Sequence, residues 1–277
     1  MTVRDLLAMA SQRIGGADAR LEAELLLAHA LGASRAHLYA WPEGEPDARQ
    51  RAAFERLVAS RERGEPIAYL TGRREFWSLD LAVTPDVLIP RHETELLVER
   101  ALARIPRDRP VRIADLGTGS GAVALALARE RPLAHVTATD SSTAALDVAR
   151  GNAERLAIGN VAFAAGDWYA AVGDARFDVI VSNPPYIAAG DAHLAAGDLR
   201  FEPMPALASG ADGLDAIRRI VADAPAHLAD EGALLLEHGF DQAVRVRALF
   251  DAAGFESIAS IRDEGGHERV TLGTKRG

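Results

Sequence analysis

The first 72 residues carry the apolar spacing of helices. Leucine and alanine recur at three- and four-residue intervals in a helix that Asp18 is placed to cap and Gly32 to end. The positions with this spacing are Leu21, Leu25, Ala28 and Leu31, with Leu26 and Leu27 beside them. A second helix is predicted over 47–63, with Ala53, Leu57 and Val58 facing inward. The pattern predicts a small helical N-terminal domain over residues 1–72.

The apolar period changes to two over residues 75–84. Apolar and polar or small side chains alternate there, which is typical of a half-buried strand. The apolar positions are Trp77, Leu79, Leu81 and Val83. We expect a short β-hairpin that links two domains and occupies residues 73–90, followed by a helix over 93–104.

Strands and helices alternate from residue 111 onward. Near-continuous apolar strands between amphipathic helices indicate a mostly parallel sheet covered on both faces. The predicted strands are 111–116, 135–140, 161–165, 177–182, 232–237, 257–261 and 269–273, and the predicted helices are 122–130, 142–156, 214–228 and 242–253. The expected fold is α/β, a seven-stranded Rossmann-like sheet over residues 91–277. Ligands of such sheets bind beyond the carboxyl ends of the strands, and the long loop 186–213 is a second place to expect function.

A glycine-rich loop follows the first of these strands. Its sequence is Asp115-Leu116-Gly117-Thr118-Gly119-Ser120-Gly121, and Asp140 ends the next strand. Glycines let a ligand approach the backbone at a helix N-terminus, and a carboxylate at the position of Asp140 accepts hydrogen bonds from ribose hydroxyls. The pattern predicts a nucleoside-bearing cofactor rather than a plain tight turn. The spacing by itself does not separate a nicotinamide cofactor from S-adenosylmethionine.

Gly166-Asp167-Trp168 follows the third strand. An acid there is placed to receive an adenine amino group, and an indole to pack on the purine. The alternative is a strand-end turn with a core tryptophan.

The tetrapeptide Asn183-Pro184-Pro185-Tyr186 directly follows the fourth strand. Consecutive prolines fix the backbone and remove two N–H donors, and Asn183 is held extended before proline. The result is a stiff loop of acceptors, namely the Asn183 side-chain oxygen and a proline carbonyl, suited to a substrate –NH2 group. Tyr186 is expected to stack on a planar amide and to shield it from water.

Composition excludes several kinds of chemistry. The chain has 277 residues and no cysteine, so thiol nucleophiles, disulfides and cysteine-ligated metals are absent, and its only lysine is Lys275. The eight histidines show no metal-binding spacing, so no metal is predicted. The net charge is −9, whereas the first 75 residues carry 11 basic and 11 acidic side chains. An acidic C-terminal segment argues against nucleic acid as the main partner.

The glycine loop followed by Asn183–Tyr186 resembles class I S-adenosylmethionine-dependent N-methyltransferases. More narrowly, the chain resembles the PrmC/HemK-type release factor glutamine methyltransferases over nearly its whole length. The segments that carry the narrower resemblance are 64–72, 88–95, 200–203, 235–239 and 268–271. One departure is His92, where the family more often has proline after Pro90-Arg91. We do not expect His92 to be catalytic.

The resemblance implies the activity and its participants. The methyl group of S-adenosylmethionine would pass to the side-chain amide of the glutamine in the Gly-Gly-Gln tripeptide of class 1 release factors, leaving S-adenosylhomocysteine. By the same resemblance the cofactor would be held by Asp115, Gly117, Thr118, Gly119, Ser120, Gly121, Asp140, Asp167, Trp168 and Asn183. The catalytic and substrate-binding residues would be Asn183, Pro184, Pro185 and Tyr186. We expect a cytoplasmic monomer whose N-terminal domain docks the protein substrate.

Two other functions fit parts of the sequence. An adenine-N6 methyltransferase would present its substrate amino group to the same acceptor loop, but a basic surface and a target-recognition domain are expected of it. A non-catalytic module with a nucleoside pocket would bind the cofactor without turnover.

Overall fold

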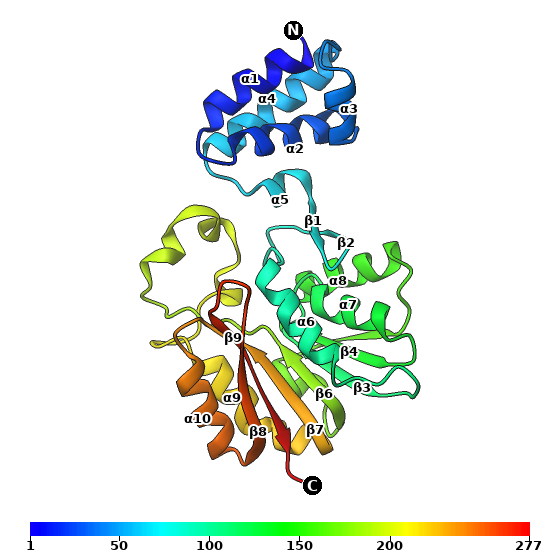
Figure 1. Cartoon of the computed structure of the whole chain (residues 1–277), viewed down its shortest axis with the longest axis vertical. Coiled ribbons are helices and arrows are strands. Elements are labelled where there is room, and N and C mark those ends of the chain that lie inside the picture. Colours follow the sequence, from blue (N-terminus) through cyan, green and yellow to red (C-terminus); the bar gives the residue numbers. More distant parts are fainter. The chain divides into compact units, whose positions relative to one another are not determined.

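The computed structural model describes all residues, 1–277, and they form two compact units (Figure 1). The first comprises Met1–Arg73 together with Ala196–Phe201. The second comprises Arg74–Ala195 and Glu202–Gly277. The first unit is helical, and the second contains the large sheet. None of the helices combines the length and the apolar composition needed to cross a membrane.

The N-terminal unit is a set of short helices around one apolar cluster. Its helices are α1 (Val3–Ile14), α2 (Ala19–Leu31), α3 (Arg35–Ala40), α4 (Ala48–Glu62) and α5 (Ile67–Thr71). Asp47 caps α4 by accepting a hydrogen bond from the Gln50 backbone N–H. Leu6, Leu26, Leu27, Phe54 and Val58 are almost completely buried in the cluster.

The predicted inward face of α2 is partly wrong. Leu21 is 41% exposed. At about 100° per residue it lies more than 100° around the helix from both Leu26 and Leu27, which define the buried face. The Asp18 side chain makes no capping hydrogen bond, although Asp18 is the residue before the helix. In α4 the predicted positions Ala53 and Leu57 are half-buried, and Phe54 is the inward residue beside Val58.

The predicted hairpin is present and lies within residues 73–82. Strands β1 (Arg73–Phe76) and β2 (Leu79–Ala82) are joined by Trp77 and Ser78, both with positive φ. Trp77 therefore belongs to the turn and not to a strand. Its backbone N–H donates to Oε1 of Glu95, which fixes the turn to the next helix.

The second unit is built on a seven-stranded sheet. Its strands are β3 (Arg112–Leu116), β4 (His135–Asp140), β5 (Val161–Ala165), β6 (Phe177–Ser182), β7 (Leu228–Glu237), β8 (Phe255–Arg262) and β9 (Glu268–Lys275). They lie in the order β5-β4-β3-β6-β7-β9-β8, and β9 alone runs opposite to the other six strands. The predicted fold class is confirmed. β7 begins at Leu228, earlier than predicted, because a bulge with Glu231 at positive φ interrupts its apolar pattern.

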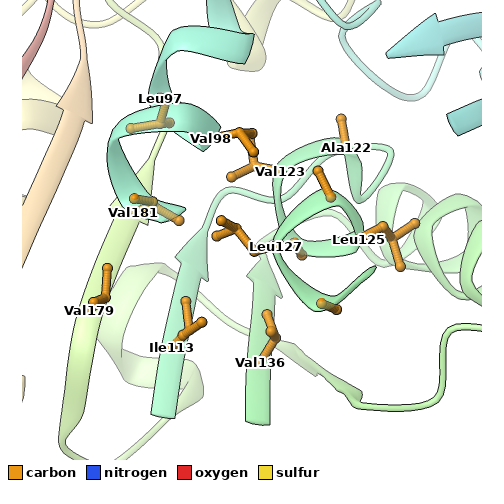
Figure 2. Packing of buried hydrophobic residues seen from close by; sticks show 14 of the residues in the cluster. Leu97, Val98, Ile113, Ala122, Val123, Leu125, Leu127, Val136, Val179 and Val181 are labelled. Atoms are coloured by element: carbon orange, nitrogen blue, oxygen red, sulfur yellow. The ribbon is translucent and has the colours of Figure 1, made fainter. Parts of the chain in front are cut away.

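Helices cover both faces of this sheet. They are α6 (Glu95–Leu102), α7 (Ala122–Glu130), α8 (Thr143–Arg155), α9 (Asp215–His227) and α10 (Ala243–Ala252). Alternate strand residues point to opposite faces. Ile113 and Val181 therefore share a cluster with α6 and α7, whereas Ala114 and Ile180 pack against α9 and α10. Figure 2 shows the first cluster, with Leu127 of α7 above Ile113 and Val136.

Candidate functional site

A cavity of about 240 Å³ lies in the second unit, where β3, β4, β5 and β6 end. These strands are parallel neighbours, so their carboxyl ends share one edge of the sheet. The predicted site residues that line the cavity are Asp115, Gly117, Thr118, Gly119, Ser120, Asp140, Asp167, Trp168, Asn183 and Pro185. Gly121, Pro184 and Tyr186 are not among the lining residues.

Two glycines of the loop after β3 are required for different reasons. Gly117 has φ +75°, and a Cβ there would lie 3.3 Å from the Trp168 ring. Gly121 has φ +84°, and a Cβ there would lie 3.1 Å from Leu125 and 3.2 Å from Ala149. Gly121 therefore permits close packing behind the cavity, between the loop and the helices, whereas Gly117 lets the indole approach the backbone.

Asp115 supports the loop from inside the protein. Its Oδ2 accepts hydrogen bonds from the Thr118 hydroxyl (2.7 Å) and from the Ala124 backbone N–H in the first turn of α7 (3.1 Å). Burial raises the pKa of this carboxyl to about 6. These bonds hold the loop and the start of α7 in place, a task that the sequence pattern does not reveal.

Asp140 lies across the loop at the end of β4. Its Oδ2 accepts from the Gly119 backbone N–H and its Oδ1 from the Ser142 N–H, both at 2.9 Å. Each carboxylate oxygen accepts more than one hydrogen bond, so both oxygens keep acceptor capacity for ligand hydroxyls. The backbone bonds orient the carboxylate in advance.

Asn152 of α8 fastens the glycine loop to the hairpin. Its side chain is fully buried, donates to the carbonyls of Ser120 and Ala82 (2.9 Å each), and accepts from the Ala82 N–H (2.7 Å). Replacing Asn152 by alanine leaves the buried Ser120 carbonyl unpaired, at about 1–3 kcal/mol, and leaves the Ala82 N–H and carbonyl unpaired at a lower cost, because Ala82 is only half-buried. We expect Asn152→Ala to lower the free energy of unfolding by about 2–4 kcal/mol. Urea denaturation measures this, and a loss below about 0.5 kcal/mol would contradict the bracing role.

Asp167 has a partner that was not predicted. Arg219 of α9 donates to its Oδ2 at 2.6 Å, and both side chains are more than half exposed. Trp168 has φ +51° and packs partly against the cluster beneath α9 while also lining the cavity. The sequence offered two alternatives for Trp168, a ligand-contacting residue and a core tryptophan. In the structure Trp168 both lines the cavity and packs on the core.

The Asn183 side chain is oriented by Thr94. Its Nδ2 donates to the Thr94 hydroxyl oxygen at 3.1 Å. With Nδ2 engaged in this bond, Oδ1 has no partner in the protein. A residue that lines the cavity therefore retains an unused acceptor oxygen.

Tyr186 is directed into the protein rather than toward the cavity. Its hydroxyl donates to Oε1 of Glu237 at 3.2 Å, and its carbonyl accepts from Nε2 of Gln242 at 2.8 Å. Burial raises the pKa of the Tyr186 phenol well above its usual value. Tyr186 is not among the residues that line the cavity, and its stacking on a substrate amide stays a prediction.

Several cavity residues were not predicted as site residues. One wall is formed by Asp86, Val87, Leu88, Pro90, Arg91 and Thr94, and another by Pro203, Pro205 and Ala206. Glu202, with a fully buried side chain, connects the walls by accepting from the Ile89 N–H at 3.0 Å and pairing with Arg91. The available signals were Pro85 and Pro90, which restrict the backbone of the first wall, and the aperiodic 186–213 loop. His92 is 72% exposed and lies outside the cavity.

Comparison with known proteins decides the family. The family described as Methyltransferase small domain matches residues 92–201, and the one described as PrmC N-terminal domain matches residues 5–72. A release factor glutamine methyltransferase of Xylella fastidiosa (strain Temecula1) is 53% identical over 97% of this chain and 96% of its own length. The chain belongs to the release factor glutamine methyltransferase family. The Escherichia coli (strain K12) member is 47% identical over 95% of both chains.

Solved structures of other methyltransferases have a fold similar to that of this family member. A methyltransferase from Pyrococcus furiosus has a TM-score of 0.54 at 21% identity, covering 72% of this chain and 90% of that one. The T. thermophilus 16S rRNA N2 G1207 methyltransferase, in complex with AdoMet and guanosine, has a TM-score of 0.55 at 22% identity. It covers 74% of this chain and 50% of that one. At these identities the likeness concerns the fold alone.

Proposed function

We propose that this protein transfers a methyl group from S-adenosylmethionine to the side-chain amide nitrogen of the glutamine in the Gly-Gly-Gln tripeptide of class 1 release factors. The observation that carries the proposal is the free acceptor Oδ1 of Asn183, held at the cavity by Thr94. Membership of a family named for glutamine methylation supports the same chemistry.

The cavity residues fit S-adenosylmethionine. The Asp140 carboxylate keeps acceptor capacity beside the Gly119 backbone, and nothing lies within 4 Å of the position that a Cβ of Gly119 would take. We assign the ribose hydroxyls to Asp140, the backbone approach to Gly117–Ser120, and the adenine to the neighbourhood of Asp167 and Trp168. When bound, the cofactor supplies an electrophilic methyl group on a sulfonium.

The loop after β6 would activate the amide nitrogen of the substrate. An amide nitrogen is a weak nucleophile because its lone pair is delocalised into the carbonyl. Asn183 Oδ1 and a carbonyl of Pro184 or Pro185 would accept the two N–H hydrogens, orient the nitrogen and favour localisation of its lone pair. The nitrogen becomes acidic as it acquires its fourth bond, so its proton can pass to water without a strong general base.

The test is methyl transfer from labelled S-adenosylmethionine to a purified class 1 release factor. We expect label in the natural release factor and none in a variant whose tripeptide glutamine is alanine. Equal labelling of both, or labelling of adenine in DNA or RNA instead, would contradict the proposal.

Further features of the proposal concern partners and location. We assign docking of the release factor to the helical segment 1–72, with the hairpin 73–90 as linker and residues 91–277 as the methyltransferase domain. The excess of acidic side chains after residue 75 supports a protein substrate rather than a nucleic acid. We propose a monomer that acts in the cytoplasm, where translation supplies this substrate.

A further inference from the structure

The last residue of β7, Glu237, lies behind the acceptor loop. We propose that Glu237 is a positioning residue that sets the geometry of this loop at both ends, acting on Tyr186 directly and on Asn183 through Thr94. The inference rests on the proposed function, because Asn183 is taken to hold the substrate amide.

The Glu237 carboxyl is buried where a charged group is costly. Glu237 is only 1% exposed. Oε1 accepts the Tyr186 hydroxyl at 3.2 Å, whereas Oε2 is buried without a hydrogen-bond partner. Burying a carboxylate with an unused oxygen destabilises a protein. This carboxyl is present next to the acceptor loop although it destabilises the fold, which is expected if it positions the loop.

Thr94 lies beside the carboxyl and is hydrogen-bonded to Asn183. Its hydroxyl oxygen accepts from Asn183 Nδ2, and a hydroxyl has one hydrogen of its own to donate. Thr94 is 4% exposed, and its hydroxyl and that of Tyr186 both act on the Glu237 carboxyl to lower its pKa. Oε2 of Glu237 has no hydrogen bond in the structure, so an ionised Glu237 would draw the Thr94 hydroxyl hydrogen toward itself and leave a lone pair of Thr94 facing the Asn183 amide.

The other bonds that hold the loop do not involve a titratable group. Gln242 accepts from the Gly239 N–H at 2.9 Å and donates to the Tyr186 carbonyl. These neutral amide contacts anchor the C-terminal end of the loop at any pH. Among the groups that anchor the loop, control by protonation therefore falls to Glu237.

The charged and titratable surroundings of Glu237 set the direction of this control. Burial is the largest influence and raises the pKa of the carboxyl to about 7; Glu93 also raises it, and Arg269 lowers it. The neighbouring His238 has a pKa lowered by burial; its Nδ1 donates to the Gly239 carbonyl, and its Nε2 shares a hydrogen bond with the Thr271 hydroxyl. Tyr186 stays protonated because its own pKa is raised. Protonation of Glu237 replaces charge-assisted hydrogen bonds by neutral ones, which are roughly half as strong, and so loosens the loop.

The experiment combines the pH profile of turnover with a signal from the unliganded protein. For Glu237→Gln we expect kcat to fall about tenfold to a hundredfold, typical of groups that orient a reacting side chain, with S-adenosylmethionine affinity retained within about threefold. In the unaltered protein kcat should rise as pH increases through about 7. In Glu237→Gln that rise should be absent. Thr94→Ser should keep most activity, and Thr94→Val should resemble Glu237→Gln.

The second readout is the NMR signal of the Asn183 side-chain amide, identified by its loss in Asn183→Ala. We expect it to shift with pH through about 7 in the unaltered protein and not in Glu237→Gln. This titration needs no substrate, so it tests the positioning role even if the proposed activity fails. Glu268→Gln, which removes a carboxylate of β9 that pairs with Arg247 of α10, is the matched control and should keep both pH responses. An unchanged pH profile and an unchanged Asn183 titration in Glu237→Gln would overturn the proposal.

Discussion

Replacing Asn183 by alanine is expected to lower the rate of methyl transfer about a thousandfold and to leave the dissociation constant for S-adenosylmethionine within about tenfold. The variant loses the one cavity acceptor that Thr94 holds in place, so the substrate amide is no longer oriented. Cofactor affinity is expected to change less, because Asp140 and the glycine loop provide most of the predicted contacts.

Single-turnover kinetics with a release factor and calorimetry with the cofactor measure the two quantities separately. His193→Ala is the control, since it alters an exposed side chain on the following loop outside the cavity. A rate for Asn183→Ala within about tenfold of the unaltered protein would mean that the amide is activated elsewhere.

Replacing Asp140 by alanine is expected to weaken S-adenosylmethionine binding by about a hundredfold or more. Hydrogen bonds to a charged group contribute about 1.5–3 kcal/mol each, and two ribose hydroxyls are assigned to this carboxylate. The change also releases the Gly119 and Ser142 backbone N–H groups that shape the loop.

Calorimetric titration with the cofactor measures the effect. Asp147→Asn is the matched control, because Asp147 lies on α8, is 76% exposed and pairs only with Arg150. A dissociation constant for Asp140→Ala within threefold of the unaltered protein, in a normally folded variant, would assign the ribose to other residues.

The sheet and the edge that carries the cavity could be predicted from the sequence because they depend on local patterns. Strands β3 to β6 are short and largely apolar, and a glycine, an acidic residue or a proline stands at or within two residues of the end of each. Parallel pairing then brings these ends together. The sequence therefore predicts the glycine loop, Asp140 and Asn183 at one edge of the sheet.

The contacts that refine the site could not be predicted, because they join residues far apart in the chain. Tyr186 and Glu237 are 51 positions apart, and Asn183 and Thr94 are 89 apart. No spacing rule indicates that a tyrosine hydroxyl will meet a buried carboxylate. The same holds for Arg219 beside Asp167 and for Glu202 between the cavity walls.

Locating the transferred methyl group tests the central claim most directly. The release factor is incubated with the protein and S-adenosylmethionine, digested, and its tripeptide-containing fragment sequenced by tandem mass spectrometry. We predict a single methyl group on the side-chain nitrogen of the tripeptide glutamine, present with the unaltered protein and lost with Asn183→Ala. A methyl group on any other residue, or equal methylation by Asn183→Ala, would contradict this account.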